Sequence, residues 1–482
     1  MNVVTRFAPS PTGFIHIGNL RTALFAYLWA RKNKGMFILR IEDTDQERHV
    51  KGSVEHIQES LHWLGIEWDY GPDRSGPFGS CIQSERLETY HAFAVTLIEK
   101  DFAYPDPYTE EELAAFRANA EEEKRPFLFR DHRPESFSVW DGKTPLRFKV
   151  PEIKRYAWED AVRGDLEAGE EALDDFILLK GDGYPTYNFA HIVDDHLMGV
   201  THVFRGDEFI SSTPRFLSLY DALGIPPPAF VTLPPILRED RTKKLGKRDG
   251  AKDVLDYRSE GYLPEAMMNY LALVGWNPGT EKELFSKSEL ITAFSINQIQ
   301  RSGGAFDELK LKWFNREHIL TLPVDLFLAY ARQFLSSETY HALAKAKLLE
   351  PLVPIMRERI QTFSDLRDME AAGEFDFYVR EPAYEKEMLL WKKEPSAAKT
   401  AERLVRAQAL LELIPGNEWH GGAVKDTLWP YAESEGRGEV LWPLRVALSG
   451  REKSPDPFII AGMIGKDATI KRIQKAVGSL EA

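Results

Sequence analysis

The sequence has very little cysteine, since Cys81 is the only one among its 482 residues. A single thiol excludes an internal disulfide framework and is typical of the reducing cytoplasm. The sequence also lacks any uninterrupted apolar run of roughly 18 residues, the length that spans a bilayer. The chain begins on a short apolar strand pattern and not on a basic and then apolar leader. We therefore expect a cytoplasmic protein without a membrane anchor.

Acidic residues are absent from the first 41 positions, although the whole chain carries a formal charge of −14. An acidic chain argues against a generic nucleic-acid binder, because its surface repels polyanions. Two basic stretches stand out: Arg6, Arg21, Arg31, Lys32, Lys34 and Arg40, and then Arg241, Lys243, Lys244, Lys247, Arg248 and Lys252. Such islands favour selective docking of RNA. Ordinary solvated helix faces are the alternative that charge alone leaves open.

The order of strand and helix patterns predicts an α/β protein. Strands and helices alternate over residues 1–100 and again over 183–239, as in the two halves of a Rossmann-like, doubly wound parallel sheet. In the first half we expect a strand at 36–41. A helix should follow, capped by Ser53 and ended by Gly65. The length of the chain leaves room for further domains.

Three further parts have other patterns. Residues 101–182 are charged and punctuated by proline, which indicates an α+β domain inserted between the halves of the sheet. Residues 240–321 are basic and then helical. From 322 to 482 helical periodicity dominates, for example at Leu404 and Leu413, and predicts an all-helical C-terminal region.

The turn at 9–19 is the most informative stretch of the chain. It joins a short strand to an amphipathic helix that begins near residue 20. The N-terminus of a helix attracts phosphate through its backbone N–H groups and its dipole. Gly13 and Gly18 remove side chains where a nucleotide must come close, and His16 can donate to a phosphate oxygen. The spacing differs from that of the Walker A loop and the Rossmann glycine fingerprint.

Four motifs follow one another along the chain. They are Arg6–Gly13 with His16-Ile17-Gly18-Asn19; Ile41-Glu42-Asp43-Thr44-Asp45; Asp182–His191 with Val193–His196 and Val203–Glu208; and Lys244-Leu245-Gly246-Lys247-Arg248. In this order they resemble the glutamyl form of the class I aminoacyl-tRNA synthetases. The first is similar to that family's HIGH motif and the last to its KMSKS loop. The resemblance is strong over residues 1–320 and looser beyond.

The resemblance implies a fold, an activity and partners. The enzyme would activate L-glutamate with ATP and Mg²⁺ to glutamyl-adenylate and transfer the glutamyl group to the 3′ end of tRNA(Glu). Whether it also charges tRNA(Gln), and whether tRNA is needed for activation, stay open. The insertion at 101–182 would bind the acceptor end, residues 240–321 would contact the stem, and 322–482 would bind the anticodon. We expect a monomer.

The resemblance also assigns residues to ATP. His16, Gly18, Lys244 and Lys247 carry over as catalytic residues, and His16, Gly18, Lys247 and Glu208 as ATP ligands. A histidine at a helix start and a lysine on a basic loop can together neutralise the triphosphate, whose charge must be offset as pyrophosphate leaves. Taken singly, His16 would be an ordinary surface histidine and Lys247 a solvated lysine.

A second set carries over to glutamate. It comprises Arg6, Ala8, Ser10, Glu42, Tyr187 and Arg205. Arginine suits a side-chain carboxylate because its fork is bidentate and permanently charged. Glu42 can hold the α-ammonium group from the end of a parallel strand. Asp43 and Asp45 cap or pair locally. His191 occupies a pocket position that varies in the family and receives no catalytic role.

The chain departs from the family pattern at two places. Many relatives carry zinc-binding cysteines where this chain has Tyr104-Pro105-Asp106-Pro107-Tyr108, so we expect no structural zinc. Gly246 stands where the KMSKS loop usually has serine, which removes a hydroxyl and adds backbone freedom. The effect of this change on the rate stays open.

Anticodon contacts and rival functions are the remaining questions. Arg357 and Arg359 match a segment near the family's anticodon contacts, with an ordinary charged helix end as the alternative. One rival function is a glutaminyl enzyme, which would end in β-barrels. Others are a shorter tRNA-modifying relative and a noncatalytic tRNA-binding paralogue, and His16, Lys247, Arg6 and Arg205 argue against the latter.

Overall fold

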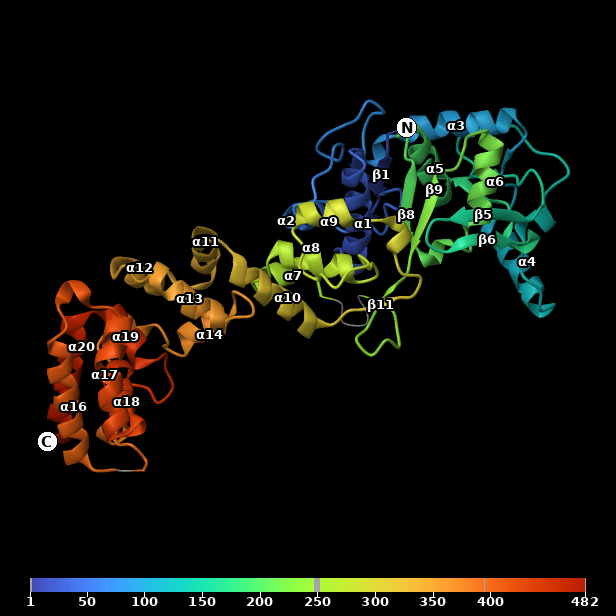
Figure 1. The fold of residues 1–482 in the computed structure, drawn as a ribbon. Coiled ribbons are helices and arrows are strands. Elements are labelled where there is room, and N and C mark those ends of the chain that lie inside the picture. The colour runs from blue at the N-terminus through green and yellow to red at the C-terminus, as the bar shows by residue number, and fades with distance from the viewer. Residues whose placement is uncertain (1, 247–251, 394, 482) are drawn as a thin grey trace. The chain divides into compact units, whose positions relative to one another are not determined.

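A computed structural model describes residues 2–246, 252–393 and 395–481 (Figure 1). The chain forms two compact units, Met1–Arg258 with Leu263–Phe314 and Ser259–Tyr262 with Asn315–Ala482. The described strands all lie in the first unit, and the second is helical. The predicted α/β fold with a helical C-terminal region is confirmed.

The main sheet has the strand order β2-β1-β8-β9-β5-β6. Its members are β1 (Val4–Phe7), β2 (Met36–Leu39), β5 (Tyr156–Asp160), β6 (Gly164–Ala168), β8 (His202–Gly206) and β9 (Ala229–Leu233). Neighbours pair in parallel from β2 to β5, and β6 closes an antiparallel hairpin with β5. The winding reverses between β1 and β8. Sheets of this kind bind ligands at the carboxyl ends of the strands beside such a reversal.

Helices cover both faces of this sheet (Figure 1). They are α1 (Ile17–Lys32), α3 (Leu87–Glu99), α5 (Tyr187–Leu197) and α6 (Thr213–Leu223). Adjacent residues of β1 show the two faces, because successive side chains of a strand point to opposite sides. The Thr5 hydroxyl donates to the Ala26 carbonyl of α1 at 2.8 Å, whereas Arg6 bonds to Asp195 of α5.

Helix α1 is more deeply enclosed than its sequence predicts. An amphipathic pattern predicts one buried face, but Ala23, Phe25 and Ala26 are fully buried together with Leu20 and Leu24. The additional cover comes from α8 (Pro264–Leu273) and α9 (Lys287–Ala293), which pack against α1. Residues near 270–290 therefore help to fix the helix whose first turn lies at the site.

Segment 101–182 contributes to two sheets. Its own antiparallel sheet contains β3 (Ala103–Pro105), β4 (Leu146–Phe148) and β7 (Phe176–Leu179), accompanied by α4 (Glu110–Glu122). Its β5–β6 hairpin extends the main sheet by pairing with β9. At the position of the family's zinc cysteines, Asp106 forms an ion pair with Arg147, and the Tyr108 hydroxyl donates to the His132 carbonyl at 2.6 Å. Among the described residues no group of three His, Cys, Asp or Glu side chains is arranged to hold a metal.

Helix α2 (Ser53–Trp63) begins differently from the prediction. Ser53 was expected to be the cap, but Gly52 is the capping residue and Ser53 is the first helical residue. The Ser53 hydroxyl instead donates to the carbonyls of Val50 and Pro11, at 2.6 and 2.9 Å. Gly65 ends the helix as predicted, with φ +67, a conformation that glycine adopts without strain.

The remaining elements of the first unit are short. They are β10 (Ile236–Leu237) and β11 (Gly304–Ala305), which pair in parallel, and α7 (Val254–Ser259), which reaches the boundary with the second unit. Helix α10 (Glu308–Thr321) also crosses this boundary.

The second unit consists of helices around a leucine-rich interior. They are α11 (Val324–Phe334), α12 (Ser337–Lys345), α13 (Leu349–Arg359), α14 (Asp365–Ala371), α15 (Asp376–Val379), α16 (Ala397–Glu412), α17 (Gly421–Glu435), α18 (Arg437–Ser449), α19 (Pro457–Ile464) and α20 (Lys466–Glu481). Leu404 is buried as its periodicity indicates, but Leu413 is 77% exposed because α16 ends at Glu412, and Leu411 is buried instead. No helix within the described ranges is long and apolar enough to cross a membrane.

Candidate active site

A cavity of about 350 Å³ lies at the carboxyl ends of β1, β8 and β9, beside the first turn of α1. Its lining brings together Arg6, Ala8, Ser10, Gly18, Glu42, Tyr187, Arg205, Glu208 and Lys244. These residues are far apart in sequence, and the reversal of the sheet at β1 and β8 places them at one edge. Lys247 lies outside the described residues.

The turn before α1 is shaped by His16 and two glycines. Gly13 has φ +145, which favours glycine. His16 is the capping residue of α1, and its Nδ1 accepts from the Gly18 N–H at 3.0 Å. Because Nδ1 accepts, a neutral ring carries its proton on Nε2. A Cβ at Gly18 would lie 2.8 Å from His16 Cε1, so this cap requires glycine.

Arg6 and Arg205, the two cavity arginines assigned to glutamate, differ in their partners. Arg6 donates from Nε and Nη2 to both oxygens of Asp195, at 3.1 and 3.4 Å. Among the described residues, Arg205 donates to two hydroxyls and to no other group, to Thr213 at 2.8 Å and to Thr232 at 3.4 Å. It forms no ion pair with any carboxylate of the described residues. Burial lowers the pKa of Arg205 to about 10, which still leaves it charged at neutral pH.

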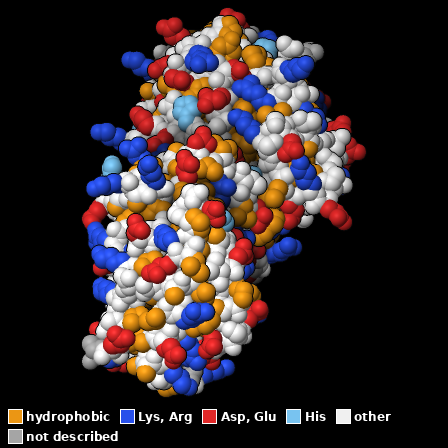
Figure 2. Space-filling model, turned by 60° about the vertical axis from the view of Figure 1, so that its left-hand side comes forward, with side chains coloured by type: hydrophobic (Ala, Val, Ile, Leu, Met, Phe, Trp, Pro, Cys, Tyr) orange, Lys and Arg blue, Asp and Glu red, His pale blue; other side chains and the backbone are white. Residues whose placement is uncertain are grey.

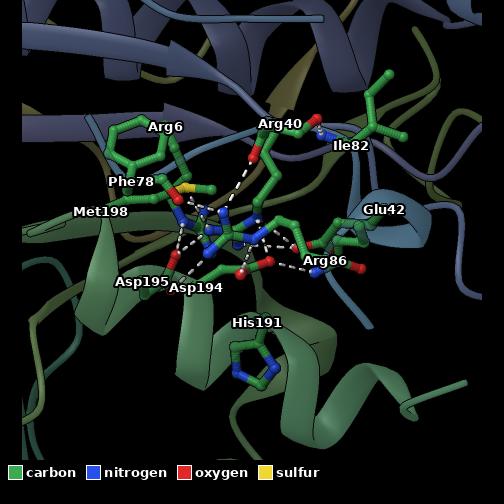
Figure 3. Close-up of polar contacts among 12 residues, drawn as sticks. Arg6, Arg40, Glu42, Phe78, Ile82, Arg86, His191, Asp194, Asp195 and Met198 are labelled. Carbon is green, nitrogen blue, oxygen red and sulfur yellow. Dashed lines mark hydrogen bonds and ion pairs between the residues drawn. The ribbon is translucent and has the colours of Figure 1, made fainter. Parts of the chain in front are cut away.

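A buried network of charges joins the cavity residues Arg6 and Glu42 to Arg40, Asp194 and Asp195 (Figure 3). Arg40 bonds to Asp195 at 2.7 Å and to Glu42 at 2.8 Å, and Arg86 bonds to Asp194 at 2.8 Å. Burial opposes the charge on Arg40, but Asp195, Glu42 and Asp194 raise its pKa on balance. Burial likewise disfavours ionised Asp195, yet Arg6 and Arg40 lower its pKa to about 2. These bonds therefore hold the side chains of Arg6 and Glu42 in fixed orientations.

Glu42 and Tyr187 also line the cavity. Burial raises the pKa of Glu42 above its usual range, although Arg40 and Arg6 offset part of the effect. Burial also raises the pKa of Tyr187, so its hydroxyl stays protonated. His191 stacks on Tyr187 with ring centroids 4.5 Å apart, and its Nδ1 lies 2.6 Å from the Tyr187 carbonyl. Burial lowers the pKa of His191 to about 4, so it supports the tyrosine as a neutral ring.

The mouth of the cavity carries an ion pair. Lys244 Nζ lies 3.1 Å from Glu208 Oε2, and both side chains are about half exposed. The backbone around Lys244 is held by a bridge to Leu237, and the Leu245 N–H donates to the Ile236 carbonyl at 2.8 Å. Burial acts against the Glu208 charge, but a backbone hydrogen bond and Lys244 lower its pKa on balance. Lys244, predicted to be catalytic, thus contacts Glu208, one of the residues predicted to bind ATP.

Asp45 has a local partner, as expected from the sequence, whereas the side chain of Asp43 bonds to a residue 41 positions away. Asp43 accepts from the Ser84 N–H and hydroxyl, at 2.8 and 2.6 Å, and Asp45 pairs with Arg48 at 2.6 Å. Neither lines the main cavity.

Some cavity residues were not identified from the sequence. Arg21 of α1 and Asp207 line the same cavity. Arg21 Nη1 donates to the Val274 carbonyl at 3.1 Å, and burial lowers its pKa to about 10. Arg21 lies three residues after Gly18 in α1, and positions i and i+3 share a face of a helix. This spacing could have predicted that Arg21 faces the cavity.

Arg357 and Arg359 lie in the second unit, near the end of α13. Arg357 donates to the Leu322 carbonyl and lies over the Phe327 ring at 5.3 Å. Arg359 forms an ion pair with Glu374. Their role toward tRNA stays a prediction.

Known families match both parts of the chain. Residues 2–313 match the family described as "tRNA synthetases class I (E and Q), catalytic domain", and residues 326–477 match "Anticodon binding domain". The chain therefore belongs to the class I tRNA synthetases of the glutamate and glutamine type, and its main sheet is the catalytic fold of that class.

Relatives that match the chain over its whole length are glutamate–tRNA ligases. That of Clostridium botulinum strain Hall is 41% identical over 100% of this chain and 99% of its own length. The one from Clostridium acetobutylicum is 40% identical over 99% and 98%. A glutamate tRNA ligase from Elizabethkingia meningosepticum, crystallised in complex with its amino acid, superposes over the full length of both chains with a TM-score of 0.83 and 36% identity.

Proposed function

We propose that this protein is a glutamate–tRNA ligase. A carboxylate oxygen of L-glutamate attacks the α-phosphorus of ATP, pyrophosphate leaves, and the 3′-terminal ribose of tRNA(Glu) then takes the glutamyl group as AMP leaves. The observation that supports this most is Arg205, a buried cation at the cavity wall whose hydrogen-bond partners within the described part of the chain are two hydroxyls. A side-chain carboxylate is the partner that such an arginine favours.

The amino acid is held by residues around Arg205. Arg6 adds a second positive charge, and the Tyr187 hydroxyl is a protonated donor on the same wall. Glu42 receives the α-ammonium group, whose positive charge favours the ionised form of a carboxylate that burial alone disfavours. Ala8 and Ser10 belong to the turn that closes the cavity at this end.

ATP, with its Mg²⁺, binds at the first turn of α1. His16 and Gly18 shape this turn, and Lys244 and Glu208 lie at the cavity mouth. Lys247 neutralises the triphosphate charge that develops as pyrophosphate leaves. Positioning and electrostatics of this kind supply most of the rate in phosphoryl chemistry.

The tRNA is bound by the insertion and by the two C-terminal parts. Residues 101–182 bind the acceptor end, 240–321 contact the stem, and 322–482 bind the anticodon with Arg357 and Arg359 as candidate contacts. On the face in Figure 2, basic and acidic side chains are interspersed, so RNA docking relies on local basic islands. The enzyme acts in the cytoplasm as a monomer.

Pyrophosphate exchange tests the proposal. We expect exchange with glutamate and ATP, measured with and without tRNA(Glu), and at least about 100-fold weaker exchange with glutamine, because an amide cannot replace a carboxylate at Arg205. A chain that exchanges with glutamine, or with no amino acid, would not be a glutamate–tRNA ligase. Aminoacylation of tRNA(Gln) alongside tRNA(Glu) determines how wide the tRNA specificity is.

A further inference from the structure

His56 of α2 makes two contacts that link segments far apart in sequence. Its ring stacks on Phe14 with centroids 4.4 Å apart and an interplanar angle of 22°. Its Nε2 lies 2.8 Å from Asp253 Oδ1. Phe14 is 47% exposed, so burial in the core does not hold it, and the stack on His56 is its ring contact.

Asp253 also contacts the turn that carries Phe14. An antiparallel bridge pairs the backbone of Asp253 with that of His16. Asp253 Oδ1 accepts from the Leu255 N–H at 2.8 Å, which orders the start of α7. His56 therefore contacts both segments that this bridge joins. It bonds to Asp253 in one segment and stacks on Phe14 in the other.

The start of α2 is joined to the same turn. The Ser53 hydroxyl and the Val50 N–H both donate to the Pro11 carbonyl, each at 2.9 Å. Helix α2 is thus fixed to the turn at Pro11 and at Phe14, and to the segment after Lys247 through Asp253. A rigid helix that holds several points of one turn restricts the geometry of that turn.

We propose that His56 is a positioning residue for adenylate formation. It holds the Phe14–His16 turn against Asp253 and so sets the geometry with which His16 and Gly18 face ATP. This role rests on the proposed function. It acts on ATP and not on glutamate, because Asp253, which His56 holds, bridges to His16, a residue assigned to ATP, and not to Arg6 or Arg205.

Kinetics of pyrophosphate exchange test this role. We expect His56→Ala to lower kcat by about 10- to 100-fold and to raise the KM for ATP, since small misplacements of a reacting geometry have effects of this size. The KM for glutamate should stay within about twofold. His56→Gln keeps a donor for Asp253, and His56→Phe keeps the ring for Phe14, so each should recover part of the lost activity.

His62→Ala is the matched control. His62 lies on the same helix and also stacks on an aromatic ring, Trp68, at 4.5 Å, but this pair is remote from the turn. The control should keep wild-type kinetics. If His56→Ala keeps wild-type kcat and ATP KM, or raises both KM values equally, the positioning role is wrong. If His56→Ala fails to fold, the same kcat and KM criteria apply to His56→Gln and His56→Phe. A wild-type protein without glutamate-dependent exchange, even in the presence of tRNA(Glu), would instead refute the proposed function.

Discussion

Replacing Arg205 gives the sharpest test of how this cavity selects glutamate. The guanidinium is bonded to Thr213 and Thr232, lies 4.1 Å from the centre of the Phe230 ring, and pairs with no carboxylate of the described residues. Arg205→Met removes the charge and keeps much of the volume. The substrate carboxylate then enters the cavity without this partner.

The magnitude follows from the burial of Arg205. Losing one partner of a buried charge pair costs about 2–4 kcal/mol, which corresponds to a roughly 30- to 1000-fold higher KM for glutamate. Burial lowers the pKa of Arg205 to about 10, so the folded protein holds this charge at a cost of roughly 3 kcal/mol. Arg205→Met should therefore melt at the wild-type temperature or above it.

Arg6→Met is the matched comparison. It leaves Asp195 buried with Arg40 as its remaining arginine, so it should raise the glutamate KM and also lower the melting temperature. The assays are pyrophosphate exchange with each substrate titrated in turn, and thermal unfolding. An Arg205→Met variant whose KM rises equally for ATP and glutamate, or which melts far below wild type, would show that Arg205 is structural or faces phosphate.

Further outcomes are expected at other positions. Lys247→Ala should lower adenylate formation mainly through kcat, by roughly 2–4 kcal/mol of transition-state stabilisation; near-normal single-turnover rates would contradict its assignment. Asp195→Asn should cost about 3–5 kcal/mol of stability at pH 7, measured by urea unfolding. The pKa of Asp195 is lowered to about 2, so the stability from its charge is fully present above about pH 4 and is lost as the pH falls through about 2; melts across this range should be flatter for the variant. Gly246→Ser should raise the exchange rate about two- to fivefold if reduced backbone freedom favours the closed loop, and a decrease would show that glycine is required. Dialysis against a chelator should shift the melting temperature by less than about 2 °C, and a larger drop would indicate a structural metal.

Short-range features could be predicted from the sequence because local rules determine them. The strand at Val4–Phe7 and the end of α2 at Gly65 follow from apolar patterning and from the conformational freedom of glycine. The position of Ser53 was off by one residue, since tertiary bonds to Pro11 compete with helix capping. The burial of Leu413 was predicted wrongly, because the apolar pattern continues past Glu412, the last residue of α16.

The partners of the site residues could not be predicted. Arg40 and Asp195 bond at 2.7 Å across 155 positions, and no local pattern specifies which charges meet over that distance. The resemblance to the family assigned the same role, glutamate binding, to Arg6 and Arg205. Only the fold distinguishes them, because Asp195 faces Arg6 while hydroxyls face Arg205. The cap formed by His16 and Gly18 could not be predicted either, because its geometry depends on the whole turn.

The order of strands in the main sheet has a consequence for synthesis on the ribosome. Strand β1 pairs with β8, and Arg6 meets Asp195, 189 residues further along the chain. At translation rates of about 5–20 residues per second, β1 waits roughly 10–40 s for this partner, with one edge unpaired. Pairing over such a distance is intrinsically slow to nucleate. The N-terminal strands, which carry the nucleotide-facing turn, are therefore the part of the nascent chain that most needs protection by chaperones until β8 has emerged.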